Sequence, residues 1–392
     1  MNPHRDVSSL VSAAVKRMEI SPIRRMSERA KHREDVINFA AGQPNFPTPT
    51  HIVEAAKRAL DEGRTLYTPI QGTSELRSAI AAHISKRCGI NVTSNEILVT
   101  FGATEAILVS ILGTIDPGDE VLIPEPGFPL YRQGVTLANG KSIGYPLRPE
   151  EGFRLDVERL KELITPKTKM IIVNSPSNPT GSVLSKNEAQ SIVDIACDHD
   201  LIVVSDEAYD HIIYDDEIHY SMASFNELQD RVILLNSFSK TYAMTGWRIG
   251  YIYLQKDLAA QISVLLHCIG LCQSSILQAA ALAAITGPQK CVEVMVAEYD
   301  RRRNATVPQL NKVPGVKAWM PKGTFYNFID IRETGLSSQQ AADLLLEKAG
   351  VSVVPGDGFG NLGEGFLRTS LALNQVTIDE AIQRMRTTFI NI

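Results

Sequence analysis

The stretch Leu201-Ile-Val-Val-Ser-Asp-Glu-Ala-Tyr209 is the clearest indication of the fold, because an unbroken apolar run ends in polar, reactive residues. A run that is apolar at every position is typical of a strand covered on both faces of a sheet. Val232–Leu235 repeats the pattern and is followed by Ser237, Ser239 and Lys240. In α/β sheets, ligands bind at the carboxyl ends of the strands. The two runs therefore predict one site built at two strand ends that lie side by side.

On either side of these two stretches, apolar runs of the same kind alternate with helical segments through the middle of the chain. The strands we expect are Ile97–Phe101, Glu120–Ile123, Lys141–Tyr145, Met170–Val173, Leu201–Ser205, Val232–Leu235 and Gly250–Leu254. Such alternation predicts a mostly parallel, seven-stranded sheet wrapped by helices. Ser185 and Glu188 have the spacing of a capping box, which predicts a helix between two of these strands.

The pattern changes after Gly287. Strands of a smaller sheet are expected at Val316–Trp319, Phe325–Ile331, Val351–Val354 and Phe366–Leu371. Capping boxes at Ser337 (with Gln340) and Thr377 (with Glu380) predict interleaved helices. The predicted fold class is α/β: a large domain at 48–285, a smaller α+β domain at 286–392, and an N-terminal arm, 1–47, that packs on the smaller domain.

Composition excludes several classes of protein. The chain has 392 residues, 44% hydrophobic and 21% charged, with a net charge of -5; this is the balance of a globular protein and argues against a nucleic-acid partner. Five cysteines form no CxxC pair, so we expect no metal site and a reducing compartment. Residues 1–20 lack the apolar core of a signal peptide. The longest apolar stretch, 264–285, is interrupted by polar residues and indicates a buried or interface helix, not a membrane span. We expect a cytoplasmic protein.

Two charged residues are the first candidates for chemistry. Asp206 ends a buried strand, where a carboxylate is costly without a cationic partner, although it could simply cap the next helix. Lys240 follows the next such strand; a lone lysine is usually solvated, but beside the Asp206 strand it is placed to form a Schiff base.

Two turns add weaker signals. In Ile97-Leu-Val-Thr-Phe-Gly-Ala-Thr104, a strand turns through Gly102 into a helix whose N-terminus suits a phosphate, although many such turns merely connect elements. Asn178 lies between rigid turn residues that could aim its amide at a ligand oxygen, or it could belong to a plain Asn-Pro turn.

Together these segments carry a family resemblance. Asn178-Pro-Thr-Gly181, Ser205-Asp-Glu-Ala-Tyr209 and Ser237-Phe-Ser-Lys-Thr-Tyr-Ala-Met-Thr-Gly-Trp-Arg-Ile-Gly250 resemble motifs of class I/II (fold-type I) aminotransferases that depend on pyridoxal 5′-phosphate (PLP). Gly42-Gln-Pro-Asn-Phe-Pro47 and Phe366-Leu-Arg-Thr-Ser370 resemble two further motifs of the family. The motifs match in order and spacing from about residue 20 to residue 390.

The resemblance implies a role for each polar residue at the strand ends. Lys240 would carry PLP as an internal aldimine and then shuttle a proton at the substrate. Asp206 would pair with the pyridine nitrogen and keep it protonated, which makes the ring an electron sink. Tyr209 and Asn178 would hydrogen-bond the O3′ oxygen of the cofactor.

It also implies how the rest of the site is held. The residues expected around the phosphate are Gly102, Ala103, Thr104, Ser237, Ser239 and Arg248. Phe128 would stack on the ring, unless it is ordinary core. Arg368 would clamp the substrate carboxylate as a bidentate pair, and Gly42 would let that carboxylate approach. Tyr67 would reach the phosphate of a neighbouring subunit, which implies a homodimer with shared active sites.

The implied activity is a ping-pong transfer of the amino group of an L-amino acid to a 2-oxo acid. Bacterial aspartate aminotransferases of one subgroup often have lysine where Thr104 stands, and that lysine binds a distal carboxylate. Its absence favours aromatic or neutral donors, with 2-oxoglutarate a plausible acceptor; aspartate aminotransferase is the alternative. Another fold-type I PLP reaction, such as that of a β-lyase, would use the same cofactor residues. A regulator would need a DNA-binding domain before the match, and a scaffold without catalysis would not need Lys240.

Overall fold

A large sheet of eight strands organises the computed structural model, which describes residues 10–18, 22–31, 33 and 35–390. Its strand order is β2-β9-β8-β7-β6-β3-β4-β5. The bounds are β2 Ile97–Thr100, β3 Glu120–Glu125, β4 Lys141–Arg148, β5 Arg154–Leu155, β6 Thr168–Asn174, β7 Ile202–Asp206, β8 Val232–Ser237 and β9 Gly250–Leu254. Strands β4, β3, β6, β7 and β8 pair in parallel, which brings their carboxyl ends to one edge.

The prediction of seven strands was wrong by one. Each predicted strand is present, and β5 adds an eighth by pairing antiparallel with the end of β4, Leu147 opposite Leu155. A strand of two residues is too short to show any alternation in its sequence, because at least four residues are needed before a period of two can be recognised.

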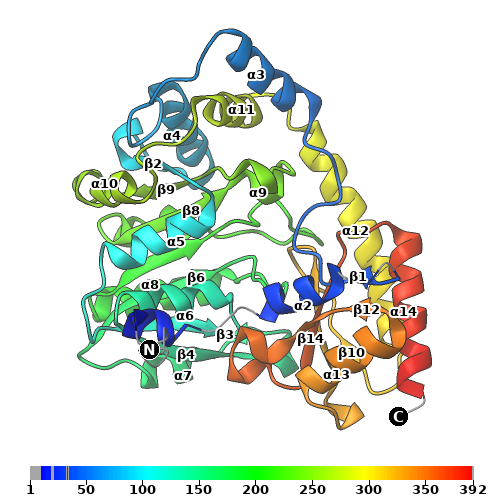
Figure 1. The fold of residues 1–392 in the computed structure, drawn as a ribbon. Coiled ribbons are helices and arrows are strands. Elements are labelled where there is room, and N and C mark those ends of the chain that lie inside the picture. Colours follow the sequence, from blue (N-terminus) through cyan, green and yellow to red (C-terminus); the bar gives the residue numbers. More distant parts are fainter. Residues whose placement is uncertain (1–9, 19–21, 32, 34, 391–392) are drawn as a thin grey trace, which may run out of the picture.

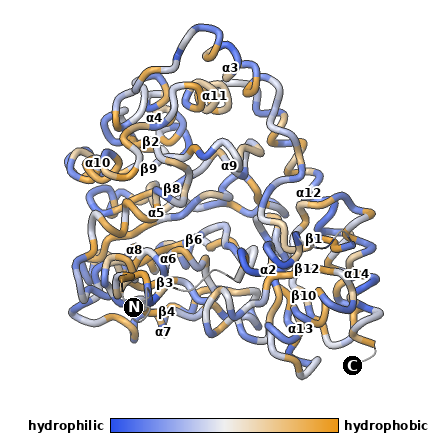
Figure 2. Tube along the Cα trace, viewed as in Figure 1, coloured by the Kyte–Doolittle hydropathy of each residue, from blue (hydrophilic) through white to orange (hydrophobic). Residues whose placement is uncertain are grey.

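Both faces of the sheet are buried, as the apolar runs predicted. Successive strand residues point to opposite faces: Ile97 and Val99 belong to one core cluster, and Leu98 belongs to the other. One face is covered by α5 (Ala103–Leu112), α6 (Pro129–Leu137) and α10 (Lys256–Gly270). The other is covered by α4 (Ser74–Cys88), α8 (Lys186–Asp198) and α11 (Ser275–Thr286), with α3 (Thr50–Asp61) packed on α11 (Figure 1). Figure 2 shows orange, hydrophobic stretches along the central strands.

Two of the three predicted capping boxes are confirmed. At the start of α8, Ser185 Oγ accepts a hydrogen bond from the Glu188 amide and the Glu188 carboxylate accepts one from the Ser185 amide, 2.8 Å. A second box forms at Ser337 and starts α13 (Ser338–Leu344). The cap predicted at Thr377 was wrong. Helix α14 (Gln375–Ile390) begins earlier, and Asn374 Oδ1 accepts from both the amide and the hydroxyl of Thr377.

The smaller sheet has the order β10-β11-β14-β13 and is antiparallel. Its strands are β10 Lys317–Ala318, β11 Tyr326–Asp330, β13 Val354–Pro355 and β14 Phe366–Ser370. Helix α12 (Lys290–Leu310, yellow in Figure 1) runs from the side of the large sheet to this sheet, where α13 and α14 also pack. The described residues also form the short helices α1 (Ala13–Lys16), α7 (Val157–Glu162) and α9 (Phe238–Thr241), and α13 continues into a π-helical turn at Leu345–Ala349.

The N-terminal segment is tied to this region by a small sheet of its own. β1 (Ile37–Asn38) pairs in parallel with β12 (Val351–Ser352), so the predicted strand Val351–Val354 is divided between two sheets. From α2 (Pro22–Lys31), Met26 is buried in the same core as α14. The domain boundaries at 47 and 285 stay predictions.

The apolar stretch 264–285 does not form one helix. It is divided between α10 and α11, and the break contains Leu271 in a left-handed conformation, φ 63°. Within the ranges described, the structure has no helix both long and apolar enough to cross a membrane.

Candidate active site

A cavity of about 610 Å³ opens at the carboxyl ends of the parallel strands. A volume of this size is typical of sites for cofactors and small substrates. The predicted residues that line it are Gly42, Ala103, Thr104, Phe128, Asn178, Asp206, Tyr209, Ser237, Ser239, Lys240, Arg248 and Arg368. Residues more than 300 positions apart in the sequence, such as Gly42 and Arg368, thus line the same cavity.

Two predicted residues lie outside the lining. Gly102 stands behind it as the N-cap of α5, with φ 79°. A Cβ atom there would lie 2.9 Å from Arg248 Nη2, so glycine is what allows the guanidinium to approach. Tyr67 is 85% exposed, on the loop between α3 and α4, and is not among the residues that line this cavity.

Asp206 ends β7 and is buried, 4% exposed. Its Oδ2 accepts a hydrogen bond from the Tyr131 hydroxyl at 2.7 Å, and its Oδ1 accepts one from the Ala208 amide at 3.2 Å. Burial raises the pKa of Asp206 and the two hydrogen bonds oppose that rise. A buried carboxylate of this kind is suited to a cationic ligand atom, which would remove the cost of burying its charge.

Lys240 lies in α9, directly after β8. Its Nζ contacts the carbonyl oxygen of Gly42 and lies 5.8 Å from the centre of the Tyr209 ring. Burial lowers the pKa of Lys240. A lysine amine that loses its proton more readily is a better nucleophile toward a carbonyl group.

One end of the cavity is built for an anion. The N-terminus of α5, with Ala103 and Thr104 in its first turn, directs backbone N–H groups toward it. Ser237 Oγ and Ser239 Oγ lie 2.9 Å apart beside it, and Arg248 supplies a positive charge. Helix N–H groups, hydroxyls and a guanidinium together match the oxygens of a phosphate.

The other end presents a second guanidinium. Arg368, in β14, is 1% exposed and lies over the Tyr326 ring at 4.2 Å. It donates to Asn178 Oδ1 and to the Ala40 carbonyl oxygen, each at 3.0 Å. Arg368 Nε is buried and has no hydrogen-bond partner in the described part of the chain. An unsatisfied buried donor on a positive side chain is what a bound carboxylate would complete.

Among the lining residues that sequence reasoning missed, Tyr131, Asn174, Tyr326 and Lys31 bear most on the chemistry of the site. Tyr131 and Asn174 both hold Asp206: Asn174 Nδ2 donates to the Asp206 carbonyl oxygen at 3.0 Å. Tyr326 lies 3.0 Å from the Tyr209 hydroxyl, oxygen to oxygen, and Lys31 comes from α2. Asn174 follows an apolar run, as Asp206 does, and that position was a usable signal. Tyr326 and Lys31 gave no such signal in the sequence, because they reach the cavity from β11 of the small sheet and from α2.

The residues present fit PLP as a cofactor. The cavity holds a lysine with a lowered pKa, a buried carboxylate for a protonated ring nitrogen, and an anion cradle for the phosphate. The unsatisfied Arg368 lies beyond them for a substrate carboxylate. The cofactor residues come from the large sheet, and the substrate cation comes from the small one.

Comparison with known proteins identifies the family of this chain. A sequence profile described as aminotransferase class I and II matches residues 34–385. An aspartate aminotransferase of Pyrococcus abyssi is 45% identical over 93% of this chain and 94% of its own length. An aromatic-amino-acid aminotransferase of Thermococcus litoralis is 40% identical over 93% and 94%. The crystal structure of an aromatic aminotransferase from Pyrococcus horikoshii superposes with a TM-score of 0.89 at 43% identity, covering 93% of this chain and 99% of that one. The chain therefore belongs to the class I and II aminotransferases, which use PLP to transfer amino groups between amino acids and 2-oxo acids.

Proposed function

We propose that the cavity is the transamination site, with Lys240 as the residue that carries the cofactor. The observation that supports it is that Asp206 ends β7 and Lys240 follows the adjacent strand β8, with Arg248 at one end of the cavity and Arg368 at the other. PLP, when bound, supplies an electron sink for the bonds at the substrate Cα. In this arrangement Asp206 holds the ring nitrogen protonated.

The remaining side chains bind and orient. Ser237, Ser239, Arg248 and the first turn of α5 bind the phosphate, and Phe128 packs on the ring. Arg368 holds the α-carboxylate of the amino acid, so that the Cα proton faces Lys240. Lys240 would take that proton from Cα and deliver it to the C4′ atom of the cofactor, as the general base and acid of the reaction.

Chemical trapping tests this assignment. Borohydride treatment of the PLP-loaded protein, followed by peptide mapping, should find the cofactor fixed on Lys240. A reduced adduct on another lysine, or on none, would remove Lys240 from this role.

For the substrate we propose an aromatic or neutral amino acid as the preferred donor. Thr104 supplies no charge where a distal carboxylate would need one, and Ile23, Ile107 and Phe128 give the cavity apolar walls. Burying a second carboxylate without a cation costs several kcal/mol. A donor panel measures this. If kcat/KM for aspartate were at least about tenfold, or 1.4 kcal/mol, above those for phenylalanine, tyrosine, alanine and methionine, the preference would be wrong.

One observation favours the alternative, aspartate aminotransferase. Lys31, near the end of α2, lines the cavity and brings a cation that the sequence reasoning did not consider. Lys31→Met separates the two possibilities, with Lys312→Met, an exposed lysine outside the cavity, as the matched control. A loss of kcat/KM for aspartate but not for phenylalanine, in Lys31→Met alone, supports a dicarboxylic donor.

We also propose a cytoplasmic homodimer with shared active sites. Leu66 and Tyr67 are 83% and 85% exposed, and α10 also exposes Val264 and Ile269; a second subunit would cover such apolar side chains. The five cysteines are free thiols, in keeping with a reducing compartment. Light scattering should give about twice 43.1 kDa, and a monomer mass would contradict the dimer; cell fractionation tests the location.

A further inference from the structure

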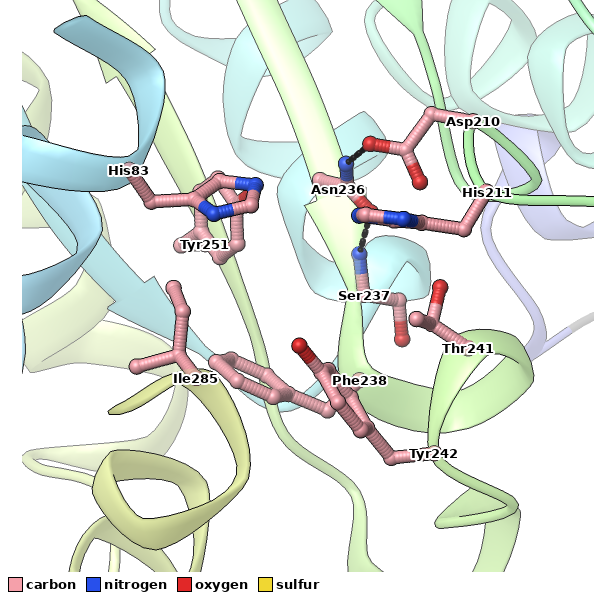
Figure 3. Close-up of a pocket in the computed structure, with 10 residues that line it drawn as sticks. All are labelled: His83, Asp210, His211, Asn236, Ser237, Phe238, Thr241, Tyr242, Tyr251 and Ile285. Atoms are coloured by element: carbon pink, nitrogen blue, oxygen red, sulfur yellow. Dashed lines mark hydrogen bonds between the residues drawn. The ribbon is translucent and has the colours of Figure 1, made fainter. Parts of the chain in front are cut away.

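A chain of buried polar contacts lies behind the phosphate cradle, on the side away from the ligand. Asn236, the residue before Ser237, accepts a hydrogen bond from the Ser237 amide at 2.6 Å and donates one to Asp210 Oδ2 at 2.6 Å. Figure 3 shows Asn236 between these two residues, with a bond to each. Asn236 is 4% exposed and Asp210 is 5% exposed, so water does not compete for these contacts.

This chain joins the two segments that carry the site. Asp210 follows Tyr209 in the turn after β7, and its amide donates to the Glu207 carbonyl oxygen at 3.0 Å. Asn236 is the residue before the last of β8, four residues before Lys240. The bond between their side chains therefore fixes the Asp206–Tyr209 turn against the Ser237–Lys240 segment.

Arg87, from α4, lies beside the buried carboxylates of Asp210 and Glu207. It forms an ion pair with Asp210 and lies 3.7 Å from Glu207 Oε2. Glu207 also accepts from Ser205 at 2.9 Å and Ser221 at 2.7 Å. Burial would raise the pKa of Glu207, but His219 and Arg87 lower it to about 2. The Glu207 carboxylate is thus held ionised in the interior.

A small cavity of about 10 Å³ touches the same contacts, and its lining includes His83, His211, Asp210, Asn236 and Ser237 (Figure 3). Asp210 Oδ1 has no hydrogen-bond partner among the described residues. The space is about that of one water molecule, which would give Asp210 Oδ1 a donor and complete its coordination.

We propose that Asn236, Asp210 and Arg87 are positioning residues for the phosphate cradle. They touch no ligand; they hold the Ser237 amide, and through this segment Lys240, at a fixed distance from Asp206. The proposal rests on the transamination site proposed above. A purely structural role would require only that the cluster stabilise the fold, and would leave PLP affinity unchanged once stability is matched.

The test exchanges the donor and the acceptor. Asn236→Asp places two carboxylates against each other and removes the donated bond, whereas Asn236→Asp combined with Asp210→Asn restores one donor and one acceptor. His83→Gln is the control, because His83 lines the same cavity without belonging to the chain of contacts. The measurements are the dissociation constant for PLP, the pH midpoint of the absorbance of the bound cofactor, and the melting temperature of the PLP-free protein.

Asn236→Asp should weaken PLP binding by at least about tenfold, since a broken buried charged contact is worth more than a factor of ten. Its absorbance midpoint should differ from that of the wild type. The double variant should recover most of both, and His83→Gln should change neither. Asn236→Asp binding PLP within about twofold of the wild type would overturn the proposal, as would an equal loss in His83→Gln.

If Asn236→Asp does not fold, Asp210→Asn is judged by the same criteria, because it keeps the size of the side chain and removes the charge. Failure of the wild type itself to bind PLP would instead overturn the proposed function, so the two failures are distinguishable.

Discussion

The two ends of the cavity are held in different ways. At the cofactor end, Asp206 and Ser237 are the last residues of adjacent parallel strands, and Lys240 follows within one turn. At the substrate end, Arg368 comes from the small sheet and is fixed by the backbone of Ala40 and the side chain of Asn178. One end is a product of a single sheet, and the other requires three separate segments to meet. Changes in the second end can therefore alter the substrate while the first end keeps the cofactor.

Replacement of Lys240, at the centre of the cofactor end, should cause the greatest loss of turnover. Lys240→Ala should reduce turnover by about 10²–10⁴-fold or more, because it removes the general base and acid. Single-turnover kinetics of the PLP-loaded variant measures this, with added small amines as the control for a missing amine. Turnover close to the wild type would show that another group moves the proton.

The next effect falls on the carboxylate beside it. Asp206→Ala should retain some PLP and lose several kcal/mol of transition-state stabilisation, about 1.4 kcal/mol for each factor of ten in kcat. The loss should appear in kcat more than in KM, since Asp206 faces the ring and not the substrate. Near-normal kcat in a well-folded variant would remove Asp206 from this role.

At the substrate end, Arg368→Lys should raise KM for amino acids by roughly tenfold and leave PLP binding nearly intact. Lysine keeps the charge but loses the planar fork that matches a carboxylate. Steady-state kinetics and a PLP titration on the same preparation separate the two effects. Release of PLP by this substitution would assign Arg368 to the cofactor end and would contradict the conclusion that the two ends are held independently.

The smallest effect concerns the support behind the cofactor end. Burial, followed by mutual repulsion with His211 and Arg87, lowers the pKa of His83 from 6.5 to about 4. The folded protein therefore keeps this imidazole neutral, and the unfolded chain binds more protons below pH 6.5. Stability is present above that pH and is lost as the pH falls toward 4, by up to about 2 kcal/mol.

His83→Gln should flatten this part of the profile, as measured by urea unfolding at pH 7 and at pH 4.5. The comparison is between the two proteins at each pH, because carboxylates add an acid loss common to both. An identical slope in wild type and variant would show that His83 is not its source.

The same contrast explains what could be predicted from the sequence. Asp206 and Lys240 were predictable because each follows an apolar run whose burial decides where the strand ends. Tyr326 and Lys31 were not, because their place in the cavity depends on packing between segments far apart in the chain. Strand β5 and the cap at Asn374 were missed for a local reason: the first is too short for a pattern, and the second competed with a nearby threonine of similar capping strength.

Arg368 donates a hydrogen bond to the Ala40 carbonyl oxygen, and β1 pairs with β12. Through these contacts the N-terminal segment, Pro22–Lys31 and residues 35–43, forms one side of the substrate end of the cavity. This segment contributes Ile23, Lys31 and Gly42 to the cavity, and it reaches the cofactor end through the contact between the Gly42 carbonyl oxygen and Lys240 Nζ. A chimaera that takes this segment from an aromatic-amino-acid aminotransferase would change the specificity for the amino acid, and it requires the exchange of only one continuous stretch of the gene. Directed evolution of this enzyme has a short cassette in which to begin.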